Sequence, residues 1–149
     1  MHLGLDQPRQ LAPLLWALLG LFVLRVAGQA LVAFFQVEFL PPMLEWYSGL
    51  VPYEYLLPSQ VAIIALMVKI CVDFTRGRGI FVEPRRFFAV YWLYFGYFYL
   101  AVMVARYPVQ MVFHPEVRWF GGTIPIFFHW VLATFVITVG LHHRQRLRP

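Results

Sequence analysis

The sequence predicts an all-α membrane protein, a bundle of four transmembrane helices capped on its outer side by short interfacial helices or turns. Two observations predict this class. Of the 149 residues, 61% are hydrophobic and only 13% are charged, and the mean hydropathy is +0.68. A soluble domain of this length has too small an interior to bury so much apolar surface. In addition, four apolar segments are long enough to cross a hydrocarbon core of about 30 Å, which takes about 20 helical residues.

The four predicted spans cover residues 10–36, 59–75, 86–107 and 123–142. Residues that favour helix ends flank them, because Ser, Thr and Asp side chains accept from free N–H groups and proline is tolerated in a first turn. The predicted starts carry Asp6 with Pro8, Pro58 with Ser59, Pro84, and Thr123 with Pro125. Arg76-Gly77 is a typical helix end. No repeat or linker is visible, which predicts a single domain over residues 1–149.

The first span is expected to be a retained helix and not a cleaved signal peptide. Gly28-Gln29-Ala30 loosely fits a signal-peptide cleavage site, but Arg25 interrupts the apolar run before it and the run continues to Phe35. A signal peptide has an uninterrupted apolar segment at this place. We therefore expect a retained helix.

The arginines predict the orientation. The loop "TRGRGIFVEPRR" and the tail "HHRQRLRP" are basic, whereas residues 37–57 contain three glutamates and no Lys or Arg. By the positive-inside rule, both termini and the second loop are cytoplasmic. The other two loops mix Trp and Tyr with prolines and acids, a composition typical of the headgroup level. The net charge of +5 and pI of 9.7 do not indicate a nucleic-acid partner, because the arginines lie between apolar runs and form no continuous face.

The first span contains an arginine, Arg25, in an otherwise apolar stretch. Arg25, Gln29 and Gln36 form a polar stripe, since eleven residues of helix return to within about 20° of the start. An arginine at mid-bilayer costs about 2.5 to 3.5 kcal/mol on insertion scales, so it should face the interior, a wet cavity or a partner. Two interpretations stay open: Arg25 holds an anionic or carbonyl-bearing ligand, or carbonyls, tyrosines or a carboxylate lock it and it fixes helix packing. Gly28 beside it allows a close helix approach.

The third span offers neighbours for Arg25. One face carries Trp92, Gly96, Tyr99, Met103 and Arg106, and Tyr91, Tyr94 and Tyr97 lie at similar depths. Aromatic faces attract a guanidinium, and tyrosine hydroxyls accept from it. These aromatics either pack the helices or line a slot for a flat ring such as a quinone. The candidate ligand-binding or buried polar residues are Arg25, Gln29, Tyr94, Tyr97, Tyr99 and His129.

The second span carries one pair of charges and the single cysteine. Lys69 and Asp73 are four residues apart, which predicts an intrahelical ion pair or a lysine that extends to the interface. Cys71 lies in the apolar run, so we expect a small buried side chain and no disulfide.

The histidines give little support for a haem or metal centre. A bis-histidine haem needs ligands from two helices, but only His129 lies inside a predicted span, so we expect no intrinsic haem. His114, Glu116 and His129 could meet outer-loop glutamates, a nitrogen and oxygen set that a transition metal accepts. Their spacing matches no tight metal motif, and a packed turn explains them equally well. We therefore predict no metal site.

The layout resembles the DoxX-like group of small four-helix membrane proteins. The similarity consists of an arginine followed by a small residue in "LRVAG" (24–28), a longer outer loop after it, a basic second loop and the total length. The resemblance implies a bacterial inner-membrane protein, and some members of the group are associated with quinone-linked oxidation of sulfur compounds. Arg25 is the only residue of this chain to which the resemblance assigns a role. The glycine-rich second helix of that group is replaced here by "VAIIALMVKICVDF", and its G-x-x-K element is missing.

Two function classes remain open. An accessory or assembly subunit of an inner-membrane complex would be small and short-looped, and another membrane protein or a second copy would cover its polar stripe. Alternatively, a self-contained bundle binds a quinone, lipid or small anion at Arg25, or acts there as a redox-linked enzyme. A small-solute transporter is less favoured, because four helices without inverted repeats would have to oligomerise. No nucleophile with a base at a recognisable spacing and no phosphate-binding glycine loop is present, so the chemistry of classical soluble enzymes is not expected. An intramembrane enzyme stays open, because its site would be assembled from scattered residues, but the sequence favours a protein that is not an enzyme.

Overall fold

The computed structural model describes residues 7–46, 51–113 and 123–148. Every element in these ranges is helical, which confirms the predicted fold class. The elements are α1 (Pro8–Phe35), α2 (Met43–Trp46), α3 (Tyr53–Arg76), the π-helical turn η1 (Phe88–Trp92) that leads into α4 (Leu93–Phe113), and α5 (Thr123–Arg146). Among the described residues, α1, α3, η1 with α4, and α5 give four segments long and apolar enough to span a membrane. The protein is a multi-pass membrane protein.

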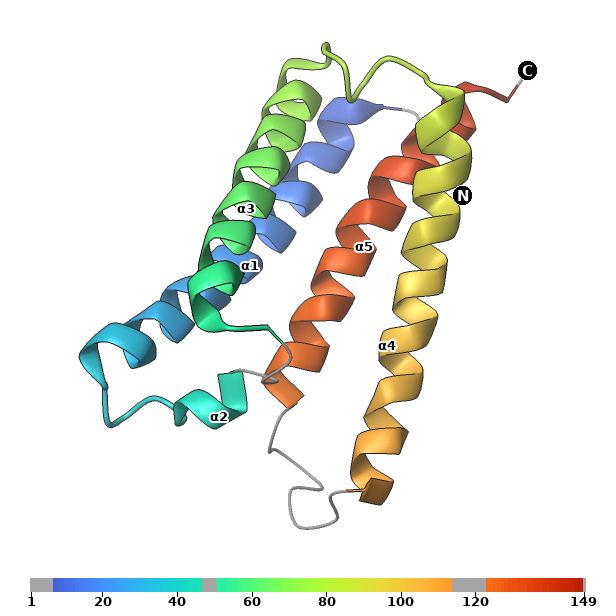
Figure 1. The fold of residues 1–149 in the computed structure, drawn as a ribbon. Helices are drawn as coiled ribbons and strands as arrows, with labels where there is room; N and C mark the ends of the chain where they lie inside the picture. Colours follow the sequence, from blue (N-terminus) through green and yellow to red (C-terminus); the bar gives the residue numbers. More distant parts are fainter. Residues whose placement is uncertain (1–6, 47–50, 114–122, 149) are drawn as a thin grey trace.

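The long helices lie side by side in the order α3, α1, α5, α4 (Figure 1). Helix α1 packs on α3 and α5, and α4 packs on α5, but α3 and α4 do not pack on each other. The start of α1, the loop 77–87 and the end of α5 lie together at one end, here called the basic end (Figure 1). The short helix α2 lies at the opposite end, here called the α2 end, and contacts α1 and α5 there.

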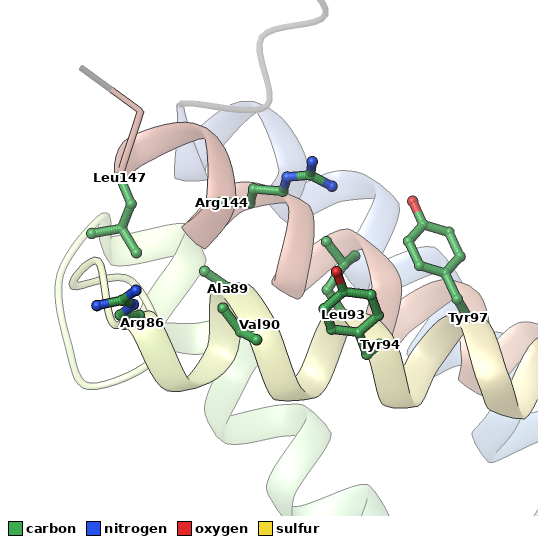
Figure 2. Close-up of a pocket in the computed structure, with 8 residues that line it drawn as sticks. All are labelled: Arg86, Ala89, Val90, Leu93, Tyr94, Tyr97, Arg144 and Leu147. Atoms are coloured by element: carbon green, nitrogen blue, oxygen red, sulfur yellow. The ribbon is translucent and has the colours of Figure 1, made fainter.

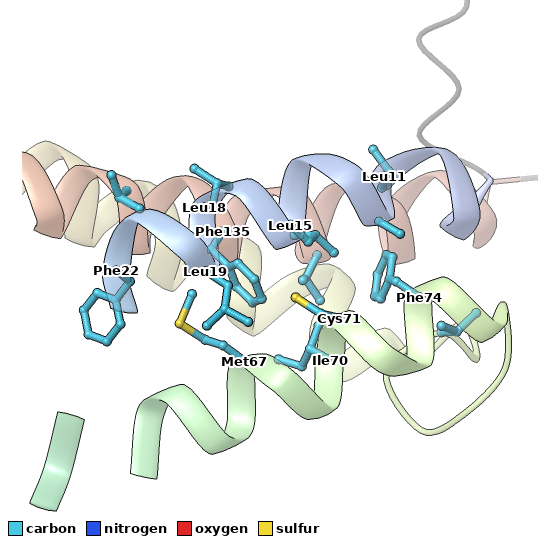
Figure 3. Close-up of a cluster of buried hydrophobic side chains, with 14 of the residues drawn as sticks. Leu11, Leu15, Leu18, Leu19, Phe22, Met67, Ile70, Cys71, Phe74 and Phe135 are labelled. Atoms are coloured by element: carbon cyan, nitrogen blue, oxygen red, sulfur yellow. The ribbon is translucent and has the colours of Figure 1, made fainter. Parts of the chain in front are cut away.

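The apolar core fills the space between α1, α3 and α5 in the half of the bundle near the basic end (Figure 3). Leu15, Ile70, Cys71 and Phe74 are 0 to 1% exposed, and Phe135 of α5 closes the cluster. Such packing, rather than hydrophobic burial, holds helices together in lipid, because lipid tails are as apolar as leucine. The burial of Cys71 agrees with the small buried side chain that the sequence predicts.

The ends of α1 and α3 depend on proline and on left-handed residues. Pro8 is the first residue of α1, where its missing N–H costs nothing. Gln36 has φ 48° and ends α1, donating its N–H to the Val32 carbonyl at 3.2 Å. Gly77 has φ 68° and ends α3, as the sequence predicts.

Three predicted boundaries need correction. Helix α3 begins at Tyr53, six residues before the predicted start, and Pro58 lies in its second turn. Helix α4 continues through Pro108 to Phe113 instead of ending at residue 107. Helix α5 runs to Arg146, four residues past the predicted end. Neighbouring helices and local adjustments re-satisfy the backbone groups that a proline frees in a membrane helix, so proline marks helix ends less strictly there than in soluble proteins.

Glycines bring α4 close to α5. A Cβ on Gly140 would lie 3.0 Å from the Cα of Leu93, and one on Gly96 would lie 2.7 Å from Cγ1 of Ile137. Small residues at helix interfaces allow such backbone approach. These contacts fix α4 on the far side of α5 from α3.

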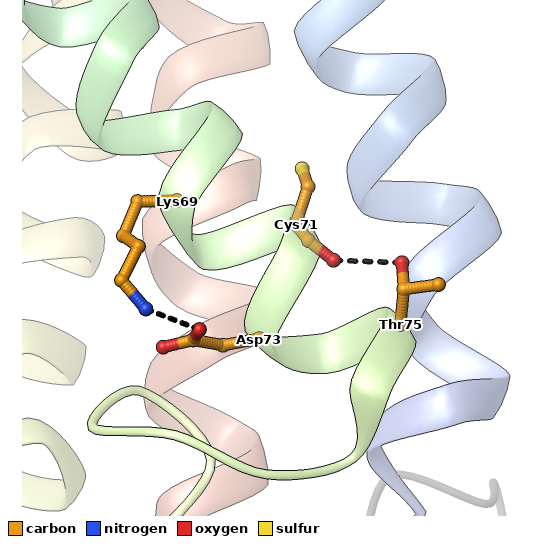
Figure 4. Close-up of polar contacts among 4 residues, drawn as sticks. All are labelled: Lys69, Cys71, Asp73 and Thr75. Carbon is orange, nitrogen blue, oxygen red and sulfur yellow. Dashed lines mark hydrogen bonds and ion pairs between the residues drawn. The ribbon is translucent and has the colours of Figure 1, made fainter.

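The charges of α3 form the predicted intrahelical pair. Lys69 Nζ donates to an oxygen of Asp73 in the next turn, with the lysine half exposed and the aspartate buried (Figure 4). Nearby, Thr75 Oγ1 donates to the Cys71 carbonyl at 2.8 Å and accepts from Trp16 Nε1 of α1 at 3.0 Å. The Trp16–Thr75 bond ties α1 to α3 near the basic end.

Candidate functional site

Arg25 lies inside the chain, three turns before the end of α1. Arg25 is 8% exposed, and its Nη2 donates to the backbone carbonyl of Trp46 at 3.1 Å. That carbonyl is at the end of α2 and also accepts from Gln29 Nε2 at 3.4 Å. The interior position that the sequence predicts for Arg25 is therefore confirmed. Its one acceptor among the described residues is a neutral carbonyl.

Gly28 makes this arrangement possible. A Cβ at Gly28 would lie 2.6 Å from Cη2 of the Trp46 ring, so only glycine leaves room for the indole against α1. Trp46 Nε1 donates to the Pro41 carbonyl at 2.8 Å, which fixes the ring from its other side. The close approach expected at Gly28 is thus made by a side chain of α2 and not by a spanning helix.

A line of buried amides leads from α1 to α3. Gln29 is 0% exposed and Gln60 is 3% exposed, and Gln60 Nε2 donates to Gln29 Oε1 at 3.2 Å. Two polar atoms of this network have no hydrogen-bond partner in the described chain, namely Arg25 Nε and Gln60 Oε1. A buried guanidinium group stays charged, and burying its charge without an anion is costly. Arg25 Nε can therefore donate a further hydrogen bond.

Tyr99 and His129 complete the site from α4 and α5. The Tyr99 hydroxyl and His129 Nδ1 are hydrogen-bonded, and their rings meet edge to face at 5.6 Å. Arg106, two turns further along α4, interacts electrostatically with both, as does Arg25. Two cations thus act on one polar cluster.

These side chains surround a cavity of about 160 Å³ between α1, α3, α4 and α5. Its polar lining comes from Arg25, Gln60, Tyr99, His129 and Ser59, and the rest is apolar or aromatic. Among the described residues that line it, none is acidic. In a low-dielectric interior, a positive potential without a carboxylate favours a ligand that brings negative charge or a strong oxygen acceptor.

An apolar groove of about 360 Å³ opens beside this cavity, where α3 and α4 do not pack on each other. Ile63, Tyr99 and Leu132 line both spaces, so the groove and the cavity meet at these residues. The remaining lining is Leu66, Met67, Ile70, Trp92, Phe95, Phe135 and Val136. A cavity with a polar lining thus lies next to a groove whose lining is almost wholly apolar.

The structure gathers four of the six predicted site residues. Arg25, Tyr99 and His129 line the cavity, and Gln29 is joined to it through Gln60. Tyr94 and Tyr97 lie elsewhere: they are 72% and 46% exposed and line a separate cleft between α4 and α5 (Figure 2). They point away because they occupy a different face of α4 from Tyr99.

Other predicted residues are also outside the cavity. Gln36 is exposed at the end of α1 and does not extend the buried stripe. His114 and Glu116 fall outside the described residues, and within the described ones no group of three or more His, Cys, Asp or Glu side chains comes together. His142 and His143, in the last two turns of α5, are fully buried.

Sequence reasoning missed Gln60 and Trp46. Gln60 had a usable signal, because an amide inside an apolar span needs a buried partner. Trp46 had none, since it contributes its backbone carbonyl, a group that every residue carries. Only the path of the chain between α1 and α3 brings that carbonyl to Arg25.

No protein-family model, curated protein or solved structure matches this chain. Its function is therefore argued from its own residues.

Proposed function

We propose that this membrane protein binds the polar headgroup of a membrane amphiphile at Arg25 and places the apolar tail of that molecule in the groove between α3 and α4. The observation that carries the proposal is a buried guanidinium whose one acceptor among the described residues is a neutral carbonyl, and which faces a cavity that shares three lining residues with an apolar groove. The headgroup is an anion or a carbonyl-bearing ring such as a quinone. A small anion alone leaves the groove unexplained.

The headgroup chemistry follows from the donors around the cavity. Within the part of the chain that the structure describes, Arg25 Nε and Gln60 Oε1 have no hydrogen-bond partner, and the Tyr99–His129 pair supplies a further polar edge. An oxygen acceptor near Arg25 gains a charge-assisted hydrogen bond, which is about twice as strong as a neutral one. The proposal agrees with the expectation from the DoxX-like resemblance, in which Arg25 is the residue carried over.

The accessory-subunit hypothesis loses its main argument. It rested on a polar stripe of the first helix that a partner helix would cover, but Trp46 and Gln60 of the same chain reach Arg25 and Gln29. A partner protein or a second copy is therefore not needed to bury these groups. Co-purification of a stoichiometric membrane partner, without any retained amphiphile, would restore that hypothesis.

We also infer that the basic end is cytoplasmic in a bacterial inner membrane. Arg9, the arginines of residues 76–86 and those of residues 144–148 gather at this end, and Glu38, Glu45 and Glu54 belong to the segment at the α2 end. The positive-inside rule assigns the basic end to the cytoplasm. Cysteine-accessibility labelling of tags at either terminus should succeed only from the cytoplasmic side.

The test is extraction and quantification of the amphiphiles that stay bound when the tagged protein is purified in mild detergent from its native membrane. Wild-type protein should retain about one amphiphile per chain, and Arg25→Gln should retain at least about tenfold less, because a charge-assisted bond is lost. Arg148→Gln removes the same charge from the exposed tail and should retain the wild-type amount. Equal retention by folded Arg25→Gln and wild type would contradict the proposal.

A second pair of variants keeps Arg25 intact. Ile63→Trp fills the junction of cavity and groove and should expel a tail-bearing ligand, whereas Val61→Trp adds the same bulk to an exposed position of α3. Retention of the amphiphile by Ile63→Trp would show that the tail does not pass this junction. Loss from both variants would show that the effect is not local.

A further inference from the structure

A second cleft, at the basic end, differs from the cavity at Arg25 in position and chemistry. It lies between the start of the η1–α4 helix and the end of α5 and has a volume of about 530 Å³. Arg86 and Arg144 flank it, and Ala89, Val90, Leu93, Tyr94, Tyr97 and Leu147 complete the lining (Figure 2). Neither candidate function uses this cleft.

Contacts between the η1–α4 helix and α5 position the backbones of the two arginines. The backbone N–H of Arg85 donates to His143 Nδ1 at 3.3 Å, and the His143 ring stacks on Phe88 with centroids 4.9 Å apart. Arg86 and Arg144 directly follow this bonded pair in the sequence. Further along, Gly140 lets α5 approach the backbone of Leu93. The positions of both arginine backbones are therefore fixed relative to each other.

Neither arginine is neutralised within the described chain. The ion pairs found there join Lys69 to Asp73 and Arg85 to Glu83, so neither pair includes Arg86 or Arg144. No acidic residue is among the described residues that line the cleft. The start of one helix and the end of another bring opposite partial charges, which offset each other, so the guanidinium groups set the sign of the site.

The cleft is also amphipathic along its length. Eleven residues separate Arg86 from Tyr97, a rise of about 16 Å along the helix. Over that distance the lining changes from arginine at the end of the bundle to alanine, valine and leucine, with the Tyr94 and Tyr97 rings on the same side as Arg144 (Figure 2). This order matches a phosphate headgroup followed by glycerol esters and an acyl chain.

We propose that the cleft between Arg86 and Arg144 binds an anionic phospholipid, with its phosphate between the two guanidinium groups and one acyl chain along Ala89, Val90 and Leu93. Charge complementarity selects the lipid, because basic pockets between helices at the cytoplasmic side recognise anionic headgroups. The site goes beyond the proposed function, since it shares no lining residue with the cavity at Arg25.

The test is native mass spectrometry of the detergent-purified protein titrated with phosphatidylglycerol, phosphatidylcholine or inorganic phosphate. Wild-type protein should bind one phosphatidylglycerol more tightly than it binds either of the others. The double variant Arg86→Gln/Arg144→Gln should weaken that binding by about 25-fold, from about fivefold for each arginine near a membrane surface. Arg78→Gln/Arg148→Gln removes the same charge from exposed positions of the basic end and should change it less than about threefold.

Three outcomes would overturn the proposal. Equal losses in the two double variants would mean that diffuse charge attracts the lipid. Equal binding of phosphatidylcholine would remove the role of headgroup charge, and equally tight inorganic phosphate would remove the role of the acyl chain. Single variants Arg86→Gln and Arg144→Gln provide the same comparison if the double variant does not fold, each with an expected loss of about fivefold.

Discussion

The two halves of the α1–α3 pair are built from the same two helices but differ in chemistry. Near the basic end, Leu15, Ile70 and Phe74 interlock with almost no exposed surface, and Trp16 is hydrogen-bonded to Thr75. Near the α2 end, Arg25, Gln29 and Gln60 face each other beside a cavity, and polar atoms remain unpaired. Side-chain packing in the half near the basic end stabilises the fold. The second half keeps polar groups and space that packing alone would eliminate, which is the usual mark of a binding site.

The largest expected effect lies in the packed half. Phe74→Ala should lower the free energy of unfolding in detergent by about 3 kcal/mol or more, because a fully buried ring leaves a cavity in a core that relaxes only partly. Phe98→Ala, at a position 70% exposed on α4, is the matched control and should cost much less. Denaturant titration measures both. Similar losses in the two variants would show that the cluster around Phe74 is not the stabilising core.

An intermediate effect is expected where α1 meets α2. Gly28→Ala should cost about 1 to 3 kcal/mol, since the added methyl would overlap the Trp46 ring and displace the carbonyl that Arg25 uses. Gly20→Ala on the same helix has nothing within 4 Å of the new Cβ and should be neutral or slightly stabilising. Thermal unfolding separates the pair. Tolerance of Gly28→Ala with unchanged tryptophan fluorescence would remove Trp46 from the site.

The smallest expected effect lies in the polar half. Tyr99→Phe deletes the hydroxyl that is bonded to His129 and keeps the ring, so the free energy of unfolding should fall by only about 1 kcal/mol. Retention of the proposed amphiphile should fall more clearly than stability does. Tyr91→Phe, at a position that is 66% exposed in η1 and lines neither proposed site, should change neither. A loss of stability as large as that of Phe74→Ala would mean that the polar half is structural after all.

Much of the site was predictable from composition and spacing, and part of it was not. An arginine in an apolar span must be inside or paired, wherever the helices go, so Arg25 and Gln29 could be found without a structure. The choice among the tyrosines of α4 could not. Tyr94, Tyr97 and Tyr99 are close in sequence, but only Tyr99 faces His129, because the Gly96 and Gly140 contacts set the rotation of α4 on α5.

The sequence alone predicts the class of protein, the four spans and the clustering of arginines, because each follows from local hydropathy, helix length and charge. It placed the helix ends less well, since a membrane helix can run through Pro58 or Pro108 when its neighbours support it. The packing of the helices sets α3 and α4 apart, brings the Trp46 carbonyl to Arg25, and places a polar cavity beside an apolar groove. These features depend on contacts between segments far apart in the chain, for which no local pattern exists.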